Sequence, residues 1–233
     1  MKFKKFIAVL GLVALLLTSC VSIPDGSPIG GSEQVKEKLT ICLDAGHGVG
    51  DVGAISPFKD GDGSEIYEKD INYALVLIIK EDLEAMGYDV ILPRGGDDEE
   101  PVAGYDDEGK SGIVQRVKFA NKNKYDLYIS IHCNSFSDEN VSGTRLYYNN
   151  GNNGKKNKKL VASLSSAIGA KFSVEPKTYD NADLYAVTAT DMPACLIEIG
   201  FITNKGDLDK MLDPSWRDDF ANALSVGISN YLK

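Results

Sequence analysis

The sequence predicts an α/β fold with a largely parallel sheet, and three observations support this. Short apolar segments alternate with longer segments whose apolar residues recur at helical spacing, as in proteins whose strands and helices alternate. Three of the short segments lead directly to residues capable of catalysis or metal binding, which are His47, His132 and Glu198. In a parallel sheet the loops at the carboxyl ends of the strands converge, and ligands commonly bind there. We therefore expect His47, His132 and Glu198 to face one pocket.

The chain starts with a segment that resembles a bacterial lipoprotein signal peptide. A lysine-rich start precedes an apolar stretch, residues 6–17, that is short for a membrane-spanning helix. Leu17-Thr18-Ser19-Cys20 then resembles a lipobox, in which the cysteine is lipidated and becomes the new N-terminus. An ordinary secretory signal with a chance cysteine is the alternative. We interpret residues 1–19 as the signal peptide. We expect Cys20 to anchor the protein, through its lipid, to the extracytoplasmic side of a bacterial membrane, in the cell envelope.

The rest of the chain is predicted to be a tether followed by one domain. Residues 20–38 start at the lipidated cysteine, show no periodic apolar pattern and are predicted to be flexible. Residues 39–233 are long enough to bury the core of a single domain. The formal net charge is −9, and removing the signal peptide, with three lysines and no acidic residue, makes it −12. Because nucleic-acid binding requires a basic surface, we expect no nucleic-acid partner.

The domain is predicted to begin with a strand, a loop, a helix and a second strand. Residues 39–44 alternate in hydrophobicity, which predicts a strand, whereas residues 46–64 are rich in glycine and aspartate and predict a loop. The apolar residues of 68–86 recur at helical spacing and end at Gly87, which predicts a helix. Residues 89–93 predict the second strand.

A long acidic segment, residues 95–112, follows the second strand. Loops of this length within a domain are usually functional insertions or disordered segments. The many carboxylates raise the idea of a calcium site, but their spacing fits no EF-hand loop. We interpret the segment as a solvated run of charge.

The middle of the domain is predicted to form two helices and two strands. Ser111 is expected to cap a helix, which leads into the strand that ends at His132. Residues 144–148 predict another strand, and a helix is expected to pack Leu160, Val161, Leu164, Ile168 and Phe172 inward. Lysines crowd the start of this helix, which we interpret as an exposed helix end, although it could meet an anionic polymer.

The end of the domain is predicted to contain two strands and a terminal helix. Residues 184–187 predict a short strand, and residues 194–199 predict the last core strand. Asp213 and Pro214 suit the N-cap and first position of the terminal helix. Three cysteines lie in or beside the predicted strands, and we interpret them as unpaired core residues: Cys42, Cys133 and Cys195.

Two histidines at neighbouring strand ends favour a hydrolytic zinc site. Such a site typically has three protein ligands and leaves one position for water. The third ligand is expected to be a carboxylate at the start of the helix after the first strand; Glu65, Glu68 and Asp70 are candidates, and spacing alone does not choose between them. Glu198 would lie within reach of the bound water and could act as a general base.

At four separate segments the chain resembles the zinc-dependent N-acetylmuramoyl-L-alanine amidases of the type-3 group. The first segment is Leu43-Asp44-Ala45-Gly46-His47-Gly48 with Asp51-Val52-Gly53-Ala54, and the second is Glu68-Lys69-Asp70-Ile71-Asn72. The third is Arg116 through Ala120-Asn121 with Ser130-Ile131-His132-Cys133-Asn134, and the fourth is Met192-Pro193-Ala194 with Glu198-Ile199-Gly200-Phe201-Ile202-Thr203-Asn204. The resemblance covers essentially all of residues 39–233. It implies a twisted, mainly parallel six-stranded sheet with helices on both faces.

The resemblance also implies a chemistry. One Zn²⁺ would be bound by His47, Glu68 and His132, and Glu198 would be the general base. The bond cut would be the amide between N-acetylmuramic acid and L-alanine in bacterial peptidoglycan. The acidic segment 95–112 is longer than is usual in the family, and we hypothesise that a regulatory partner acts on it.

Two other functions fit parts of the same pattern. A zinc peptidase that cuts within the stem peptide would use the same metal and base. A non-catalytic peptidoglycan-binding lipoprotein would have no need for all four of His47, Glu68, His132 and Glu198.

Overall fold

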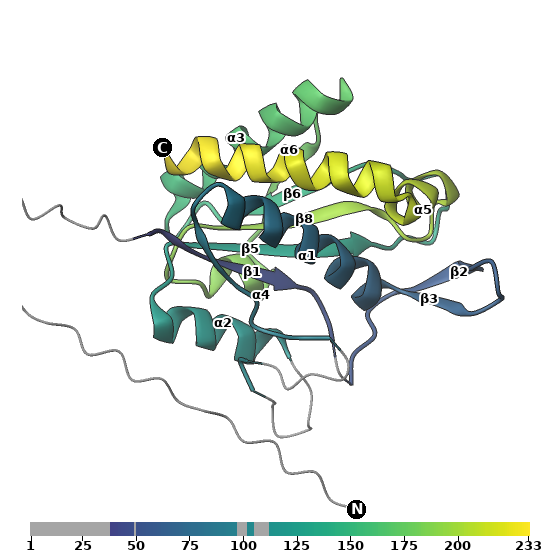
Figure 1. The fold of residues 1–233 in the computed structure, drawn as a ribbon, viewed down its shortest axis with the longest axis horizontal. Coiled ribbons are helices and arrows are strands. Elements are labelled where there is room, and N and C mark those ends of the chain that lie inside the picture. The colour runs from purple at the N-terminus through teal and green to yellow at the C-terminus, as the bar shows by residue number, and fades with distance from the viewer. Residues whose placement is uncertain (1–37, 49, 97–101, 105–111) are drawn as a thin grey trace, which may run out of the picture. The chain divides into compact units, whose positions relative to one another are not determined.

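The computed structural model describes residues 38–48, 50–96, 102–104 and 112–233. A six-stranded sheet lies at the centre of this part of the chain (Figure 1). Its strands, in order across the sheet, are β4 (Asp89–Ile91), β1 (Thr40–Ala45), β5 (Leu127–Asn134), β8 (Ala194–Phe201), β6 (Arg145–Tyr148) and β7 (Lys177–Asp180). The first four are parallel to one another, β6 is antiparallel to β8, and β7 is parallel to β6. The predicted α/β fold with a mainly parallel six-stranded sheet is therefore confirmed.

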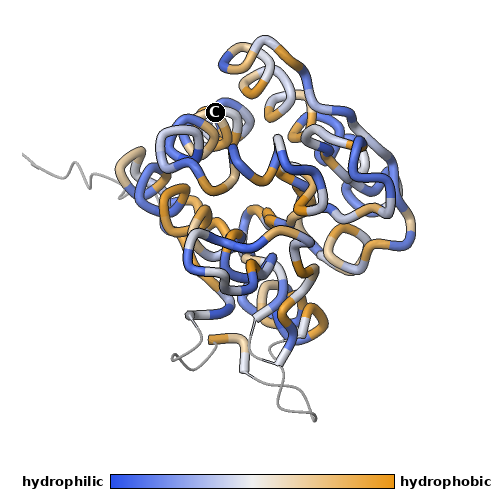
Figure 2. Tube along the Cα trace, turned by 90° about the vertical axis from the view of Figure 1, so that its right-hand side faces the viewer, coloured by the Kyte–Doolittle hydropathy of each residue, from blue (hydrophilic) through white to orange (hydrophobic). Residues whose placement is uncertain are grey.

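Helices cover both faces of the sheet, as predicted. On one face lie α1 (Glu68–Ala85), α3 (Gly154–Phe172), α5 (Lys205–Leu212) and α6 (Pro214–Leu232). On the other face lie α2 (Ile113–Asn123) and α4 (Tyr185–Thr188). The alternation along β1 explains the two layers, because Ile41 and Leu43 belong to the first core and Cys42 to the second. In Figure 2 the hydrophobic stretches are concentrated on the strands at the centre.

Of the two predicted helix caps, one is confirmed and the other lies outside the described residues. Asp213 caps α6, since its side chain accepts a hydrogen bond from the backbone N–H of Trp216 at 2.7 Å, and Pro214 is the first helical residue. The N-cap of α2 is Gly112, which makes no side-chain cap hydrogen bond, and Ser111, which was expected to cap this helix, lies outside the described residues.

The strand predicted at 184–187 is wrong, because this segment is helical. The side chain of Asn181 accepts hydrogen bonds from the backbone N–H groups of Asp183 (2.7 Å) and Leu184 (2.9 Å). The carbonyl of Leu184 then accepts from Val187 and Thr188, both at 3.1 Å. An Asn side chain that bonds the next N–H groups turns the backbone, so this short apolar segment becomes the helix α4.

Four elements have no counterpart in the sequence-based prediction. β2 (Ile55–Lys59) lies within the segment 46–64 that was predicted as loop, and β3 (Glu65–Tyr67) follows that segment and pairs with β2 as an antiparallel hairpin. The edge strand β7 is exposed along its whole length, so its sequence carries no alternation. The fourth is the short helix α5.

The cysteine prediction is confirmed, since Cys42, Cys133 and Cys195 are buried and free. None of the helices that the structure describes combines the length and hydrophobicity needed to cross a membrane. The predicted signal peptide, Cys20, nearly all of the tether and most of the acidic segment 95–112 lie outside the described residues.

Candidate active site

Three parallel neighbours, β1, β5 and β8, bring the predicted site residues together. His47 lies two residues beyond the end of β1, and His132 lies near the carboxyl end of β5. Glu198 on β8 is paired with His132 across the two strands. The three residues therefore lie together at the carboxyl ends of parallel strands, as predicted.

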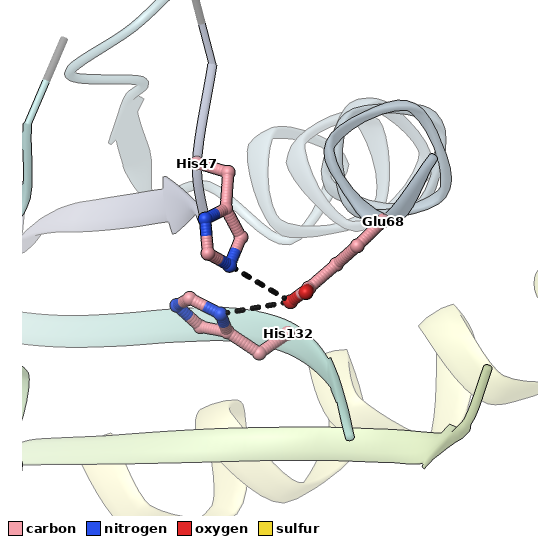
Figure 3. Close-up of side chains that lie close together, drawn as sticks. All are labelled: His47, Glu68 and His132. Atoms are coloured by element: carbon pink, nitrogen blue, oxygen red, sulfur yellow. Dashed lines mark hydrogen bonds and ion pairs between the residues drawn. The ribbon is translucent and has the colours of Figure 1, made fainter. Parts of the chain in front are cut away.

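The carboxylate of Glu68, the first residue of α1, reaches both histidines from one side (Figure 3). Its Oε1 is 3.2 Å from Nε2 of His47 and 3.0 Å from Nδ1 of His132. Backbone N–H groups of Ala54 (2.9 Å) and Cys133 (3.0 Å) also donate to this carboxylate. Burial acts to raise the pKa of Glu68, but the hydrogen bonds and charges of the two imidazoles outweigh it and hold the pKa well below its usual range.

The three candidate carboxylates differ in whether they contact the histidines. Glu65 lies on β3, exposed, in an ion pair with Lys59, and Asp70 is exposed beside Lys69. Only Glu68 of the three joins both histidines, with one ligand atom of each residue lying within 4.8 Å of the others.

Asp51 orients His47, a role that the sequence analysis did not assign. His47 has a φ of 66°, in the left-handed region that non-glycine residues seldom occupy. Backbone hydrogen bonds in both directions between Gly48 and Asp51 (2.9 and 3.0 Å) hold this turn, and Asp51 Oδ2 lies 2.8 Å from Nδ1 of His47. A proton on Nδ1 leaves Nε2, which faces Glu68, free to bind a metal.

The environment of His47 favours its protonated form when no metal is present. Burial acts to lower the pKa, but hydrogen bonds and charges from Glu68 and Asp51 outweigh it and raise the pKa to about 9. The cluster therefore attracts positive charge, which is the property required of a cation site.

Glu198 differs from Glu68 in the hydrogen bonds that its carboxylate receives. Within the described residues, its Oε2 is buried and has no hydrogen-bond partner. Burial raises the pKa of Glu198 to about 7, opposed by the nearby His132 and reinforced by the charge of Glu68. A carboxyl group with a pKa near neutrality can both accept and release a proton during a reaction.

Comparison with known proteins agrees with this geometry. A family profile described as N-acetylmuramoyl-L-alanine amidase matches residues 41–230, which is most of the chain. The chain belongs to the N-acetylmuramoyl-L-alanine amidase family. It is an amidase that acts on peptidoglycan.

Similar proteins include relatives of comparable length and one that is much longer. The amidase is 31% identical to YqiI of Bacillus subtilis over 95% of each chain. It is 28% identical to the germination-specific N-acetylmuramoyl-L-alanine amidase of the same species, over 82% of this chain and 78% of the relative. It is also 27% identical to the amidase LytC of that species over 83% of this chain, but spans only 36% of LytC.

Solved structures of amidases share the fold. The CwlD amidase of Clostridioides difficile, solved in complex with the GerS lipoprotein, superposes with a TM-score of 0.69 at 28% identity. The match covers 84% of this chain and 98% of that one. Cwp6 of Clostridium difficile superposes with a TM-score of 0.71 at 26% identity, over 84% of this chain and 30% of that one.

Two glycines allow the imidazoles of the amidase to lie so close to the backbone. A Cβ atom on Gly46 would lie 2.2 Å from the His132 ring. At Gly53, where φ is +70°, a Cβ atom would lie 2.6 Å from the His47 ring and 2.7 Å from the carboxylate of Glu68. Any larger residue at either position would displace a predicted ligand.

A buried ion pair supports the loop that carries His47. Arg116 Nε donates to Asp44 at 2.5 Å, and Tyr128 (2.8 Å) and Ser130 (2.7 Å) donate to the other oxygen of the same carboxylate. Burial acts to raise the pKa of Asp44, but the charge of Arg116 and the hydrogen bond from Ser130 outweigh it and lower the pKa. Arg116 also reaches the carbonyl of His47 at 3.4 Å, so the pair fixes the backbone beneath the site.

Proposed function

We propose that the amidase uses one Zn²⁺, held by His47, Glu68 and His132, to cut the amide between N-acetylmuramic acid and L-alanine, with Glu198 as general base. The observation that carries the proposal is the convergence of three ligand-type side chains beside Glu198, a half-buried glutamate whose Oε2 is buried and has no hydrogen-bond partner in the described part of the chain.

The three side chains fit zinc in type and in spacing. Two imidazoles and one carboxylate are a common ligand set for hydrolytic zinc, which leaves a fourth position for water or substrate. Ligand atoms at about 2.0–2.2 Å from a tetrahedral ion would lie roughly 3.3–3.6 Å apart. The Glu68 oxygen lies 3.2 Å from His47 Nε2 and 3.0 Å from His132 Nδ1, close to that separation.

Glu198 supplies the proton transfers that the reaction requires. When bound, zinc would polarise the amide carbonyl and make water more acidic. Glu198 accepts a proton from the attacking water as the new C–O bond forms. It then gives this proton to the L-alanine nitrogen as the C–N bond breaks, so that a lactyl carboxylate and a free amine leave the site. Its raised pKa suits both steps.

The cellular location and the binding partners are part of the same proposal. We infer from the lipobox that Cys20 carries a lipid and holds the enzyme on the outer side of a bacterial membrane, within reach of peptidoglycan. We also propose that a protein partner regulates the enzyme through residues 95–112. A solved relative that is an amidase in complex with a lipoprotein supports the idea of a partner.

The test is a digest of purified peptidoglycan by the full-length chain, with zinc or with a chelator, read by mass spectrometry. We expect free stem peptides that begin at L-alanine, an intact glycan, and no products with chelator. Shortened peptides still attached to muramic acid would instead establish a peptidase. Zinc-dependent binding without products would establish a binding protein.

The matched variants are Glu198→Gln and, as control, Glu65→Gln. Both changes remove one carboxylate charge, but Glu65 is exposed on β3 and pairs with Lys59. Only Glu198→Gln should abolish product formation.

A further inference from the structure

Arg145 lies beside Glu198 on the same face of the sheet. Strand β6 runs antiparallel to β8, and Arg145 is directly opposite Glu198 in the register. Directly opposed residues on antiparallel strands project from the same face. A positive charge is therefore placed one strand away from the proposed general base.

The guanidinium of Arg145 is held by aromatic rings rather than by a carboxylate. Its central carbon lies 4.5 Å from the centroid of the Phe201 ring and 5.9 Å from that of Tyr179. Tyr179 in turn stacks on Tyr147, with centroids 5.2 Å apart. Among the described residues Arg145 makes no ion pair, and its Nε is buried without a hydrogen-bond partner.

These contacts leave Arg145 suited to bind an anion. An arginine stays charged at any relevant pH and carries five donors in a planar fork that matches a carboxylate. Stacking against the aromatic rings fixes the plane of the guanidinium and leaves the N–H groups at its edge available to donate hydrogen bonds. Burial raises the pKa of Glu198 and the charge of Arg145 acts across the strands to lower it, but the two side chains form no ion pair. A partly buried cation that makes no ion pair within the described part of the chain is costly, and a carboxylate that arrives with the substrate would reduce this cost.

The chemistry of the substrate indicates which side of the amide supplies this carboxylate. The carboxyl group of the lactyl arm is already used in the amide to be cut, and N-acetylated sugars are uncharged. The stem peptide, in contrast, carries free carboxyl groups. Neighbouring strands lie about 4.8 Å apart, and one extended residue spans roughly 3.3–3.6 Å. An anion at Arg145 would thus belong to a residue within one or two positions of the cut.

We propose that Arg145 binds the free carboxylate of the residue that follows L-alanine, and so makes the amidase prefer stem peptides in which this group is not amidated. The inference rests on the proposed amidase reaction. It adds a specificity-determining contact on the peptide side of that reaction.

The test compares two soluble muramoyl peptides that differ only in this group, which is a carboxylate in one and a carboxamide in the other. The full-length wild type, Arg145→Gln and the control Lys159→Gln are compared with zinc present; Lys159 is an exposed cation on α3. A charge-assisted hydrogen-bonded pair is typically worth about tenfold or more in affinity. We expect the wild type and the control to have about tenfold higher kcat/KM on the carboxylate peptide, mainly through KM. Arg145→Gln should lose this preference and cut the amidated peptide as the wild type does.

Binding of the free stem peptides gives a readout that does not depend on turnover. In a Glu198→Gln background, calorimetry should find the carboxylate peptide bound about tenfold more tightly than the amide, and Arg145→Gln should abolish the difference. Equal use of both peptides by the wild type would overturn the inference while leaving the amidase reaction intact. A loss in kcat that is the same on both peptides would also overturn it, because Arg145 would then act through Glu198. Absence of cleavage by the wild type, with zinc bound, would reject the proposed reaction itself.

Discussion

The two halves of the active site differ in how their polar groups are satisfied. On the β1–β5 side, the carboxylate of Glu68 receives two imidazoles and two backbone N–H groups. On the β8–β6 side, Glu198 Oε2 and Arg145 Nε are buried without hydrogen-bond partners among the described residues. A buried polar atom that lacks a partner costs about 1–3 kcal/mol. The polar groups of the first half are therefore satisfied without substrate, whereas those of the second half lack hydrogen-bond partners that a bound substrate could supply.

The largest effect is expected from Glu68→Gln, which changes the carboxylate that contacts both histidines in the first half of the site. The substitution removes the negative charge that both histidines face, so we expect zinc and activity to be lost together. Outer ligand partners already contribute about 10–100-fold to metal affinity, and loss of a ligand should cost more. Zinc content after dialysis and peptidoglycan digestion measure the two effects. Retention of zinc at the wild-type level would contradict the assignment of Glu68 as a ligand.

Breaking the second half with Glu198→Gln should separate zinc binding from catalysis. Loss of a general base typically lowers the rate about 10²–10⁴-fold, and none of the three proposed ligands is altered. We expect kcat to fall by this amount while the zinc content stays that of the wild type. Loss of zinc by this variant would place Glu198 among the ligands and remove the distinction between the halves.

The pH dependence of zinc affinity follows from the protonation of His47, in the first half of the site. With a pKa of about 9, His47 carries a proton in the metal-free protein at neutral pH, and zinc must displace it. Apparent affinity should therefore rise about tenfold per pH unit between 7 and 9 and then level off. Competition with a chelator of known affinity measures this rise. Proton release at pH 7, measured by calorimetry in two buffers, should be close to one per zinc.

The same proton should affect the stability of the metal-free protein. Because the folded-state pKa of His47 is raised, its contribution is fully present below its ordinary pKa and is lost as the pH rises through about 9. A metal-free protein whose stability increased over this range would contradict the assigned shift.

A smaller effect is expected from Asp51→Asn, which weakens the first half without removing a ligand. The change keeps the shape of the side chain but loses the charge that orients His47 from 2.8 Å. Zinc affinity should fall about 10–100-fold, and kcat at saturating zinc should stay within a few-fold of the wild type. An unchanged affinity would mean that the Gly48–Asp51 turn alone fixes the imidazole.

The sequence predicted those site residues that lie at the carboxyl end of a core strand. His47, His132 and Glu198 follow or end apolar segments, so strand order alone placed them together. Residue spacing could not choose among Glu65, Glu68 and Asp70, because the choice depends on where α1 begins and on the β3 pairing that exposes Glu65. Asp51 was not assigned a role, since its contact depends on the left-handed φ of His47.

The fold was predictable where burial leaves a pattern and not where local hydrogen bonds decide. The core strands and α1 carry clear periodicity. The edge strand β7 is fully exposed and has none. The segment at 184–187 is apolar enough for a strand, but two hydrogen bonds to Asn181 turn it into α4. Arg145 gave no signal in the sequence, because its importance lies in the register that places it opposite Glu198.

The smallest effect should come from a change that lies outside both halves of the site. Asp213→Ala removes the cap of α6, which should lower the free energy of unfolding by about 1 kcal/mol and Tm by roughly 2–4 °C. Asp218→Ala is the matched control, since it removes the same charge from an exposed position of the same helix. Both variants should bind zinc and turn over peptidoglycan as the wild type does at 25 °C. A loss of turnover in Asp213→Ala alone would contradict this expectation. It would show that the positions of Glu198 and Arg145 depend on the stability of the whole domain and not only on their immediate neighbours.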